Sequence, residues 1–503
     1  MNRSLLARLA IVVATAPLVV LGMAALWAAT FAPVPRRGHV RITVWGLPSG
    51  EDNKGLAAQI AEFERRTGIE VKNLSMGAGN MNAQKLMTSI VGGVPPDLVR
   101  QDRFTIGDWA SRDTFQPLDD FIRADTEPWR IVPEEYYPPC WQEAVYRGRV
   151  YAIPESTDDR LLYWNKAIFR EAGLDPERPP QTWEELKELA VRLTRYNRDN
   201  TFRRIGFIPN YGNAWLYLYS WQNGGEFMSP DGRTCTLANP YTREALEYMK
   251  SVYDALQGAE RVSSFQSTFQ GNELDPFLMG QVAMVITTNG YLRTIARYGR
   301  ELDFGVAPPP VPAARLRGEG RFRGQPRFIT WSGGFSYAIP RGSRHPREAW
   351  LFIKWMNSLD GRRVFHEAQR RWNHENGRPY VPDMSANRVV NERIYAEFAP
   401  AGDDPVSRRL RAGMQVSLDM MAYARFRPVT FVGQRLWDEH VRAFEQTIRN
   451  KLSAQQALEV GQRVVQEELD KVFRRERHPV VPWGYPVVAG ALAQAAAVAA
   501  FVA

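Results

Sequence analysis

Strand and helix patterns alternate through residues 40–99, and this alternation constrains the fold of the chain more than any other feature. Apolar runs predict strands and amphipathic periodicity predicts helices, in the order strand 41–46, helix 55–67, strand 69–71, helix 82–92 and strand 97–99. Gly68 follows the first of these helices, where a glycine C-cap is typical. Strands joined by helices in this way form a parallel sheet with helices on its faces. The sequence therefore predicts an α/β fold.

The rest of the chain continues the α/β pattern with more helix. Thr182 and Glu185 match a capping box at the start of a predicted helix, and residues 435–475 predict two amphipathic helices with a break at Asn450. At 503 residues the chain is longer than one ordinary domain, so we expect two or three.

Composition excludes several classes of function. The net charge of +9 is spread over 64 Lys and Arg and 55 Asp and Glu residues that alternate along the chain, without the basic face or tail of a nucleic-acid-binding protein. Two cysteines and six scattered histidines give no basis for a metal cluster, and no phosphate-binding or dinucleotide-binding motif is found. We therefore expect no nucleic-acid partner, no metal and no cofactor. A mean hydropathy of -0.38 also excludes a polytopic membrane protein.

Both ends of the chain are apolar. Arg3 and Arg8 precede an uncharged stretch at 9–31, which is the pattern of an export signal and is long enough to span a bilayer. Residues 1–37 are therefore predicted to be either a cleaved signal peptide or an uncleaved anchor. The end of the chain has no charged residue after 478, and we expect residues 479–503 to form a C-terminal transmembrane helix. That helix would be an anchor or the first helix of a permease; a packed C-terminal helix is the alternative. The body is predicted to be extracytoplasmic or periplasmic and tethered to the cytoplasmic membrane.

A series of segments across residues 40–472 occurs in the order of a known family. The segments include ITVWG, IAEFERRTGIEV, VPPDLV, YRGRVYAIPESTDDRLLYWNKAIFREAGLDP, PQTWEELKELA, WQNGGEFMSPDG, FLMGQVAMVITTNGYL, DFGVAPPP and WSGGFSYAIPRGSRHPREAWLFIKWM. With these segments the chain resembles the extracellular solute-binding proteins of bacterial ABC importers, in the sugar-binding class that includes maltose-binding protein.

The resemblance implies a two-lobed periplasmic-binding-protein fold of type II, in which the lobes close on a ligand like a flytrap. By carry-over, residues 38–154 and 303–358 form the amino-proximal lobe, and residues 155–302 and 359–478 form the second lobe. The resemblance also places Cys140 and Cys235 in different lobes, where a disulfide would hinder closure. We therefore expect two buried thiols.

Candidate ligand-binding residues combine aromatic faces with planar polar groups in loops after predicted strands, as sugar recognition requires. They are Trp45, Asp102, Arg103, Asp158, Trp215, Tyr291, Trp331, Gly333 and Gly334. For Trp45 the alternative is a place in the core, and for Asp102 and Arg103 it is a surface ion pair. Leu47, Pro48 and Ser49 stand where the family usually carries Asp or Lys, which leaves the identity of the ligand open.

The resemblance implies that the protein is the substrate-binding component of an ABC transporter. It would bind a carbohydrate between the lobes and deliver it to the transmembrane subunits of an ABC permease, with the membrane contacted through the terminal helices. The alternatives are an exported carbohydrate-active hydrolase, which would use carboxylate pairs such as Asp158 and Asp159, and a membrane-tethered sugar sensor. Because no catalytic motif is found in the sequence, we predict that the protein is not an enzyme.

Overall fold

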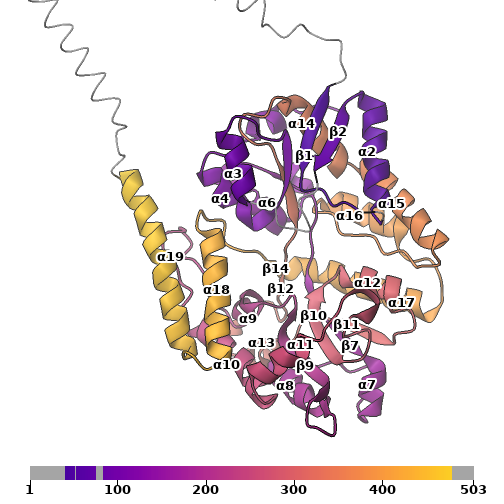
Figure 1. The fold of residues 1–503 in the computed structure, drawn as a ribbon, viewed down its shortest axis with the longest axis vertical. Coiled ribbons are helices and arrows are strands. Elements are labelled where there is room, and N and C mark those ends of the chain that lie inside the picture. The colour runs from indigo at the N-terminus through magenta and orange to yellow at the C-terminus, as the bar shows by residue number, and fades with distance from the viewer. Residues whose placement is uncertain (1–39, 51, 75–82, 478–503) are drawn as a thin grey trace, which may run out of the picture.

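The computed structural model describes residues 40–50, 52–74 and 83–477, which form two α/β lobes (Figure 1). Each lobe is built around a five-stranded sheet. The predicted signal or anchor at 1–37 and the predicted transmembrane helix at 479–503 lie outside the described residues. Within the described part, no helix combines the length and the apolar character that crossing a membrane requires.

The sheet of the first lobe has the strand order β2-β1-β3-β13-β6. Its strands are β1 (Arg41–Trp45), β2 (Glu70–Leu74), β3 (Leu98–Asp102), β6 (Ile153–Pro154) and β13 (Phe335–Ala338). The parallel pairing of β1 with β2 and β3 confirms the predicted sheet, whereas β13 runs antiparallel to β3 and β6. Successive side chains of a strand point to opposite faces of the sheet. Ile42 of β1 accordingly packs in one core with Phe63 of α2, and Trp45 packs in another core with Trp109 of α4.

The sheet of the second lobe has the strand order β11-β7-β10-β9-β8. Its strands are β7 (Arg160–Asn165), β8 (Arg195–Tyr196), β9 (Phe202–Gly212), β10 (Val282–Thr288) and β11 (Phe304–Ala307). All of β7 and most of β10 are buried, as expected for central strands that helices cover on both faces. Two short two-stranded pairs complete the strands, namely β4 (Val145–Tyr146) with β5 (Arg149–Val150), and β12 (Thr330–Trp331) with β14 (Ala424–Arg425).

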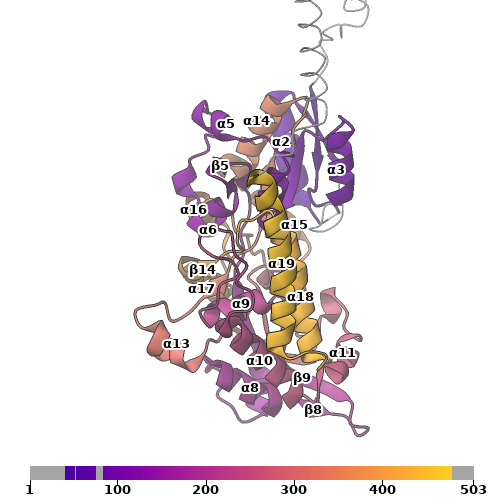
Figure 2. The same ribbon diagram turned by 90° about the vertical axis from the view of Figure 1, so that its left-hand side faces the viewer.

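Helices surround both sheets (Figures 1 and 2). Those before β10 are α2 (Lys54–Thr67), α3 (Ala83–Val91), α4 (Ile106–Ser111), α5 (Asp119–Arg123), α6 (Pro138–Glu143), α7 (Lys166–Glu171), α8 (Trp183–Arg192), α9 (Leu216–Gln222), α10 (Pro240–Ala255) and α11 (Ala259–Gln266). Those after β10 are α12 (Tyr291–Tyr298), α13 (Ala313–Arg317), α14 (Pro346–Asn357), α15 (Leu359–Glu375), α16 (Arg388–Phe398), α17 (Pro405–Met420), α18 (Gly433–Ile448) and α19 (Ala454–Arg477).

Local sequence signals account for several helix ends. Gly68 caps α2 in the left-handed conformation, with φ 71°, as predicted. Thr182 and Glu185 form the predicted capping box of α8. Asn450 has a positive φ of 58° in the turn between α18 and α19, at the predicted break. The chain direction at these three points is therefore set by neighbouring residues.

The sheet pairings differ from the expected lobe boundaries in two places. β11 pairs with β7, and Val311 forms a bridge with Thr182, so the segment after residue 303 continues in the second lobe until β13 returns to the first sheet. α15 lies against α2 of the first lobe, where the Gln369 side chain accepts a hydrogen bond from the Gly55 N–H at 3.0 Å. The expected boundaries placed residues 303–358 in the first lobe and residues 359–478 in the second. They were set without knowledge of which strands and helices pack together, and this packing decides to which lobe a segment belongs.

The two cysteines are free and buried, as expected. Cys140 belongs to the hydrophobic core around β1 and β13, and Cys235 belongs to the core around β9 and α10. Burial raises the pKa of the Cys235 thiol to about 11, so this thiol stays protonated at neutral pH.

Candidate functional site

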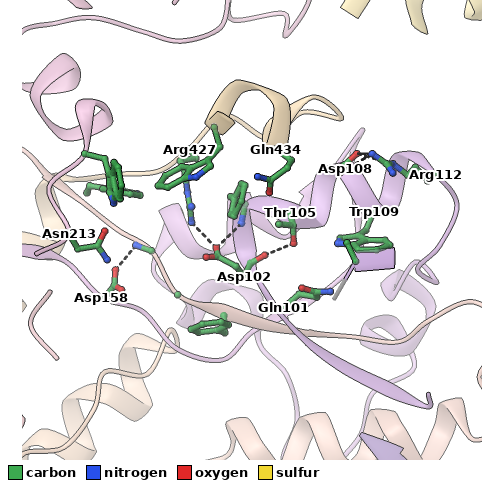
Figure 3. Close-up of a pocket in the computed structure, with 18 of the residues that line it drawn as sticks. Gln101, Asp102, Thr105, Asp108, Trp109, Arg112, Asp158, Asn213, Arg427 and Gln434 are labelled. Atoms are coloured by element: carbon green, nitrogen blue, oxygen red, sulfur yellow. Dashed lines mark hydrogen bonds and ion pairs between the residues drawn. The ribbon is translucent and has the colours of Figure 1, made fainter. Parts of the chain in front are cut away.

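A cleft of about 820 Å³ lies between the two lobes. The first lobe contributes the N-terminal part of α3, the end of β3, α4 and the start of β13, and the second lobe contributes residues after β9 and from α18. The end of β3 is the carboxyl edge of the parallel strands, where α/β proteins place their ligands. Its lining residues include Gln101, Asp102, Phe104, Trp109, Asp158, Arg160, Asn213, Trp215, Trp331, Gly333, Gly334, Phe335, Arg427, Gln434 and Trp437 (Figure 3).

An ion pair between the lobes stands at one side of this cleft. Arg427 donates from Nη2 to the Oδ1 atom of Asp102 at 2.7 Å, and its side chain is 6% exposed (Figure 3). The Arg427 guanidinium also lies 4.1 Å from the ring centroid of Phe104. Its Nε atom is buried without a hydrogen-bond partner among the described residues. Asp102 therefore neutralises Arg427, and the buried Nε atom of Arg427 lies 4.0 Å from the Oε1 atom of Glu143 beneath the cleft.

A second ion pair, between Asp158 and Arg160, lies where the segment before β7 meets the turn before β13. The Oδ1 atom of Asp158 accepts hydrogen bonds from the Gly333 N–H, at 2.7 Å, and from the Arg160 guanidinium. Arg160 also donates from Nε to the carbonyl oxygen of Asn213 at 3.1 Å. Burial lowers the pKa of Arg160, and the Asp158 carboxylate opposes that effect. Asp158 thus fixes both a backbone turn and a guanidinium at the cleft wall.

Aromatic side chains lie beside both arginines, since the Arg427 guanidinium is 5.3 Å from the ring centroid of Trp331 and 5.8 Å from that of Trp437. Trp331 is 1% exposed and lies under Arg160, whose guanidinium is 3.8 Å from the ring centroid. Trp437 of α18 lies 6.2 Å from Trp331 and 5.4 Å from Trp215, measured between ring centroids. Trp215 and Trp437 are only partly buried, so they are the aromatic faces that a ligand would reach first.

The local geometry requires a glycine at 334 and leaves little space for a side chain at 333. A Cβ at Gly334, where φ is +136°, would collide with the carbonyl oxygen of Ser156 and the guanidinium of Arg103. A Cβ at Gly333 would lie 2.9 Å from the Asp158 Oδ1 atom. The paired glycines therefore allow the backbone to approach the cleft carboxylate.

The structure brings six of the nine predicted residues together in the cleft and places three elsewhere. The six are Asp102, Asp158, Trp215, Trp331, Gly333 and Gly334. Trp45 lies in the core between β1, α3 and α4, at 7% exposed. Tyr291 lines a different cavity, where its hydroxyl donates to Asp275 and its ring packs edge-on against Tyr163.

Arg103 is fully buried beneath the cleft. Its Nε atom donates to Glu143 at 2.8 Å and its Nη2 atom donates to the Ser332 hydroxyl at 2.9 Å, and both charged side chains are 0% exposed. Its other Nη atom donates to the carbonyl oxygen of Ser156. Arg103 thus holds the two segments that carry the cleft residues, which corrects its assignment as a direct ligand contact.

Sequence reasoning missed Arg160, Arg427, Asn213 and Trp437. Arg160 could have been found, because it lies two residues after the selected Asp158. Trp437 lies near the start of the predicted amphipathic helices at 435–475. An aromatic residue in such a helix is as typical of the hydrophobic core as of a ligand-binding cleft, so the sequence does not distinguish the two. Arg427 lies between α17 and α18, outside any predicted element.

The fold and the cleft define a two-lobed binding protein, and comparison with known proteins identifies its family. The family model of the bacterial extracellular solute-binding proteins matches residues 48–362. The chain belongs to this family. Its role therefore lies outside the cytoplasm, as the family description states.

Relatives of this chain differ in the solutes that their names give. A binding protein of Brucella abortus is 25% identical over 339 residues, which is 64% of this chain and 77% of the relative. The sn-glycerol-3-phosphate-binding periplasmic protein of Salmonella typhimurium is 28% identical over 51% of this chain and 54% of its own length. The maltotriose-binding protein of Pyrococcus abyssi is 23% identical over 54% of this chain and 53% of the relative.

Solved structures share the fold. A mannobiose-bound structure matches with a TM-score of 0.66 and 23% identity, covering 85% of this chain and all of the other (100%). An ABC substrate-binding protein of Listeria monocytogenes in complex with cycloalternan matches with a TM-score of 0.67 and 18% identity, covering 86% of this chain and 100% of the other. At these identities the likeness concerns the two-lobed architecture.

Proposed function

We propose that the protein binds a neutral carbohydrate in the cleft between its lobes and delivers it to the transmembrane subunits of an ABC permease. The observation that carries this proposal is the combination of aromatic faces with planar polar groups whose charges cancel. Among the residues that the structure describes, the titratable groups lining the cleft are three carboxylates, on Asp102, Asp108 and Asp158, and three guanidiniums, on Arg112, Arg160 and Arg427. A ligand that meets a balanced set of charges gains most by being neutral and rich in hydroxyl groups.

Within this proposal, each partner group has a role. Trp215 and Trp437 stack on the C–H faces of a sugar ring, and the side-chain amides of Asn213 and Gln434 bond its hydroxyls. Asp102 and Asp158 hold the two arginines in place and accept from hydroxyls with their remaining lone pairs. The relatives named for maltotriose and the neighbours solved with sugars support a carbohydrate ligand.

The hydrogen-bond partners and positions of the carboxyl groups near the cleft favour a binding protein over a glycoside hydrolase. A glycosidase needs one carboxyl group that holds a proton near neutral pH and a second that attacks or activates water. The Oδ1 atoms of Asp102 and Asp158 are each engaged by an arginine guanidinium, so these two carboxyl groups serve to hold Arg427 and Arg160 at the cleft wall. Burial raises the pKa of Asp159 to about 8, but Asp159 bonds Ser417 in the core and does not line the cleft.

We propose that the two lobes move as units about their connecting segments. The chain crosses between the sheets after β6, near residues 155–160, and again before β13, near residues 332–334. Ligand closes the lobes by binding the closed arrangement more tightly than the open one. Residues 1–37 and 479–503 are proposed to tether the module to the membrane beside its permease, which raises its effective concentration there.

Isothermal titration calorimetry on the full-length chain tests the proposed ligand class. We expect one-to-one binding of at least one neutral saccharide among mannose, maltose, maltotriose and mannobiose, and no binding of glycerol 3-phosphate. Preferential binding of glycerol 3-phosphate would contradict the proposed neutral ligand and show that the cleft selects an anion. Release of reducing sugar from any of the oligosaccharides would refute the non-enzymatic role.

A further inference from the structure

A buried histidine stands behind the two partly exposed tryptophans of the interlobe cleft. His440 belongs to α18 and is 0% exposed, and α18 packs against α9, which begins directly after Trp215 (Figure 1). Trp437 precedes His440 by three residues, which is the spacing of neighbours on one face of a helix. Both tryptophans line the cleft, whereas His440 does not. His440 is therefore placed to act on a ligand only through its neighbours.

Aromatic rings surround the imidazole of His440. Its centroid lies 4.6 Å from that of Trp437, 4.7 Å from that of Tyr217 and 6.2 Å from that of Trp215. The corresponding angles between the ring planes are 65°, 61° and 74°. All three are edge-to-face arrangements, which aromatic pairs prefer to a face-to-face sandwich. One imidazole thus contacts both cleft tryptophans and a buried tyrosine.

A hydrogen bond to the backbone fixes how this imidazole is turned. The Nδ1 atom of His440 lies 2.5 Å from the carbonyl oxygen of Trp437. Because a carbonyl oxygen only accepts, Nδ1 carries the proton and donates it to this bond. Burial lowers the pKa of His440 to about 3, so the ring is neutral at physiological pH. The Nε2 atom is buried and has no hydrogen-bond partner among the described residues, so the Trp437 carbonyl and the aromatic contacts set the ring's orientation.

The two cleft tryptophans depend on ring contacts for their own orientation. Neither the Trp215 indole nor the Trp437 indole donates a hydrogen bond to another residue that the structure describes. Within the described chain, the aromatic rings that contact Trp215 are those of Trp437 and His440. Trp437 has further ring contacts, with Tyr217, Trp331 and Phe104. His440 is therefore the buried ring that supports both indoles from behind.

From these contacts we infer that His440 is a positioning residue of the cleft, which sets the angle at which Trp215 and Trp437 present their faces to a sugar. The inference rests on the function proposed above, because it concerns the two tryptophans proposed to stack on the ligand. The planes of these two indoles stand at 64° to each other. Removal of the imidazole would leave a cavity behind both indoles, and neighbouring side chains relax partly into such a cavity. The two stacking faces would then lose their fixed relation.

Fluorine NMR of the full-length chain labelled with 5-fluorotryptophan reports on the two indoles without a ligand. The chain has 15 tryptophans, and Trp215→Phe and Trp437→Phe each identify one resonance by its disappearance. We expect His440→Leu to shift or broaden both resonances by more than their line widths. His440→Asn keeps an N–H group for the Trp437 carbonyl but lacks the ring. It should move the same two resonances, and it carries the test if the leucine variant does not fold.

His366→Leu is the matched control. His366 is also 0% exposed, and burial lowers its pKa to about 3 as well, but its aromatic contacts are with Phe365, Tyr380 and Phe398, away from the cleft. This variant should leave both resonances in place. In calorimetric titration with a neutral saccharide that binds the natural chain, we expect the affinity to fall about fivefold or more in His440→Leu and to stay unchanged in His366→Leu.

Three results would overturn the inference. They are unchanged Trp215 and Trp437 resonances in both variants of His440, an equal displacement of these resonances in His366→Leu, and undiminished affinity for the saccharide in His440→Leu. If no neutral saccharide bound the natural chain, the proposed function would fail, and the fluorine spectra of the free protein would decide the positioning role by themselves.

Discussion

The buried ion pair of Arg103 and Glu143 provides a sharp test of how the cleft is supported. We expect Arg103→Met to destabilise the protein strongly and to affect ligand binding only through the fold. In this variant the Glu143 carboxylate, at 0% exposed, loses the donor that lies 2.8 Å from Oε2. Its Oε1 atom already has no hydrogen-bond partner, and the nearest remaining cation is Arg427 at 4.0 Å.

The magnitude follows from leaving a charge buried without its partner, which costs about 3–5 kcal/mol. The Ser156 carbonyl oxygen and the Ser332 hydroxyl also lose their donor, at the segments that carry Asp158 and Gly333. Burial raises the pKa of Glu143, so part of the cost can be relieved by protonation of Glu143 at low pH. The destabilisation should therefore be largest at neutral pH and above.

Urea unfolding followed by tryptophan fluorescence measures the effect, as a lower midpoint with an unchanged slope. Arg123→Met is the matched control, because Arg123 pairs with Asp120 at 3.0 Å while 74% exposed, and such pairs contribute about 0–1 kcal/mol. The double variant Arg103→Met with Glu143→Leu should recover much of the loss. A change of less than about 0.5 kcal/mol in Arg103→Met would refute the supporting role, because surface substitutions fall in that range.

Three further predictions concern the cleft and its surroundings. Trp215→Ala should lower sugar affinity by about tenfold or more in calorimetry, whereas Tyr196→Ala, at an exposed ring on β8, should not; equal effects would contradict the cleft assignment. Gly334→Ala should lower the unfolding midpoint, because φ is +136° and the Cβ meets the Ser156 carbonyl; an unchanged midpoint would contradict the strain argument. Asp159→Asn should gain stability relative to the natural chain as pH rises from about 4 to about 8, by at most about 1.4 kcal/mol per pH unit; a pH-independent difference in unfolding free energy would contradict it.

The sign of the Asp159 effect comes from proton linkage. Desolvation raises the pKa of this carboxyl to about 8 in the folded protein, while an unfolded aspartate titrates near about 4. Between these values the folded state holds a proton that the unfolded state has released, so stability is present at low pH and is lost as pH rises through the folded pKa. Asparagine cannot titrate and therefore removes this dependence.

The sequence predicted elements that short-range signals determine. The parallel strands β1, β2 and β3 follow from apolar runs separated by amphipathic helices, and the α8 capping box and the Gly68 C-cap need only neighbouring residues. The paired glycines at 333 and 334 were also predicted from the local sequence, because two adjacent residues without side chains indicate a close approach of the backbone to other groups.

Features that depend on distant partners were not accessible in the same way. The position of β11 in the second sheet is decided by its pairing with β7, far away in the chain. The burial of Arg103 depends on Glu143 and Ser332, which no local pattern connects to it. Arg427 reaches Asp102 across 325 residues of sequence, so only the folded chain shows that this arginine belongs to the cleft.

Binding of a neutral sugar against the aromatic wall of the cleft is tested most directly by calorimetric titration of the full-length chain and of its Trp215→Ala and Asp158→Asn variants with one sugar that binds. We expect one-to-one binding to the natural chain, weakened by about tenfold or more in both variants. Undiminished binding in both variants, or no binding of any neutral saccharide to the natural chain, would contradict the proposed function.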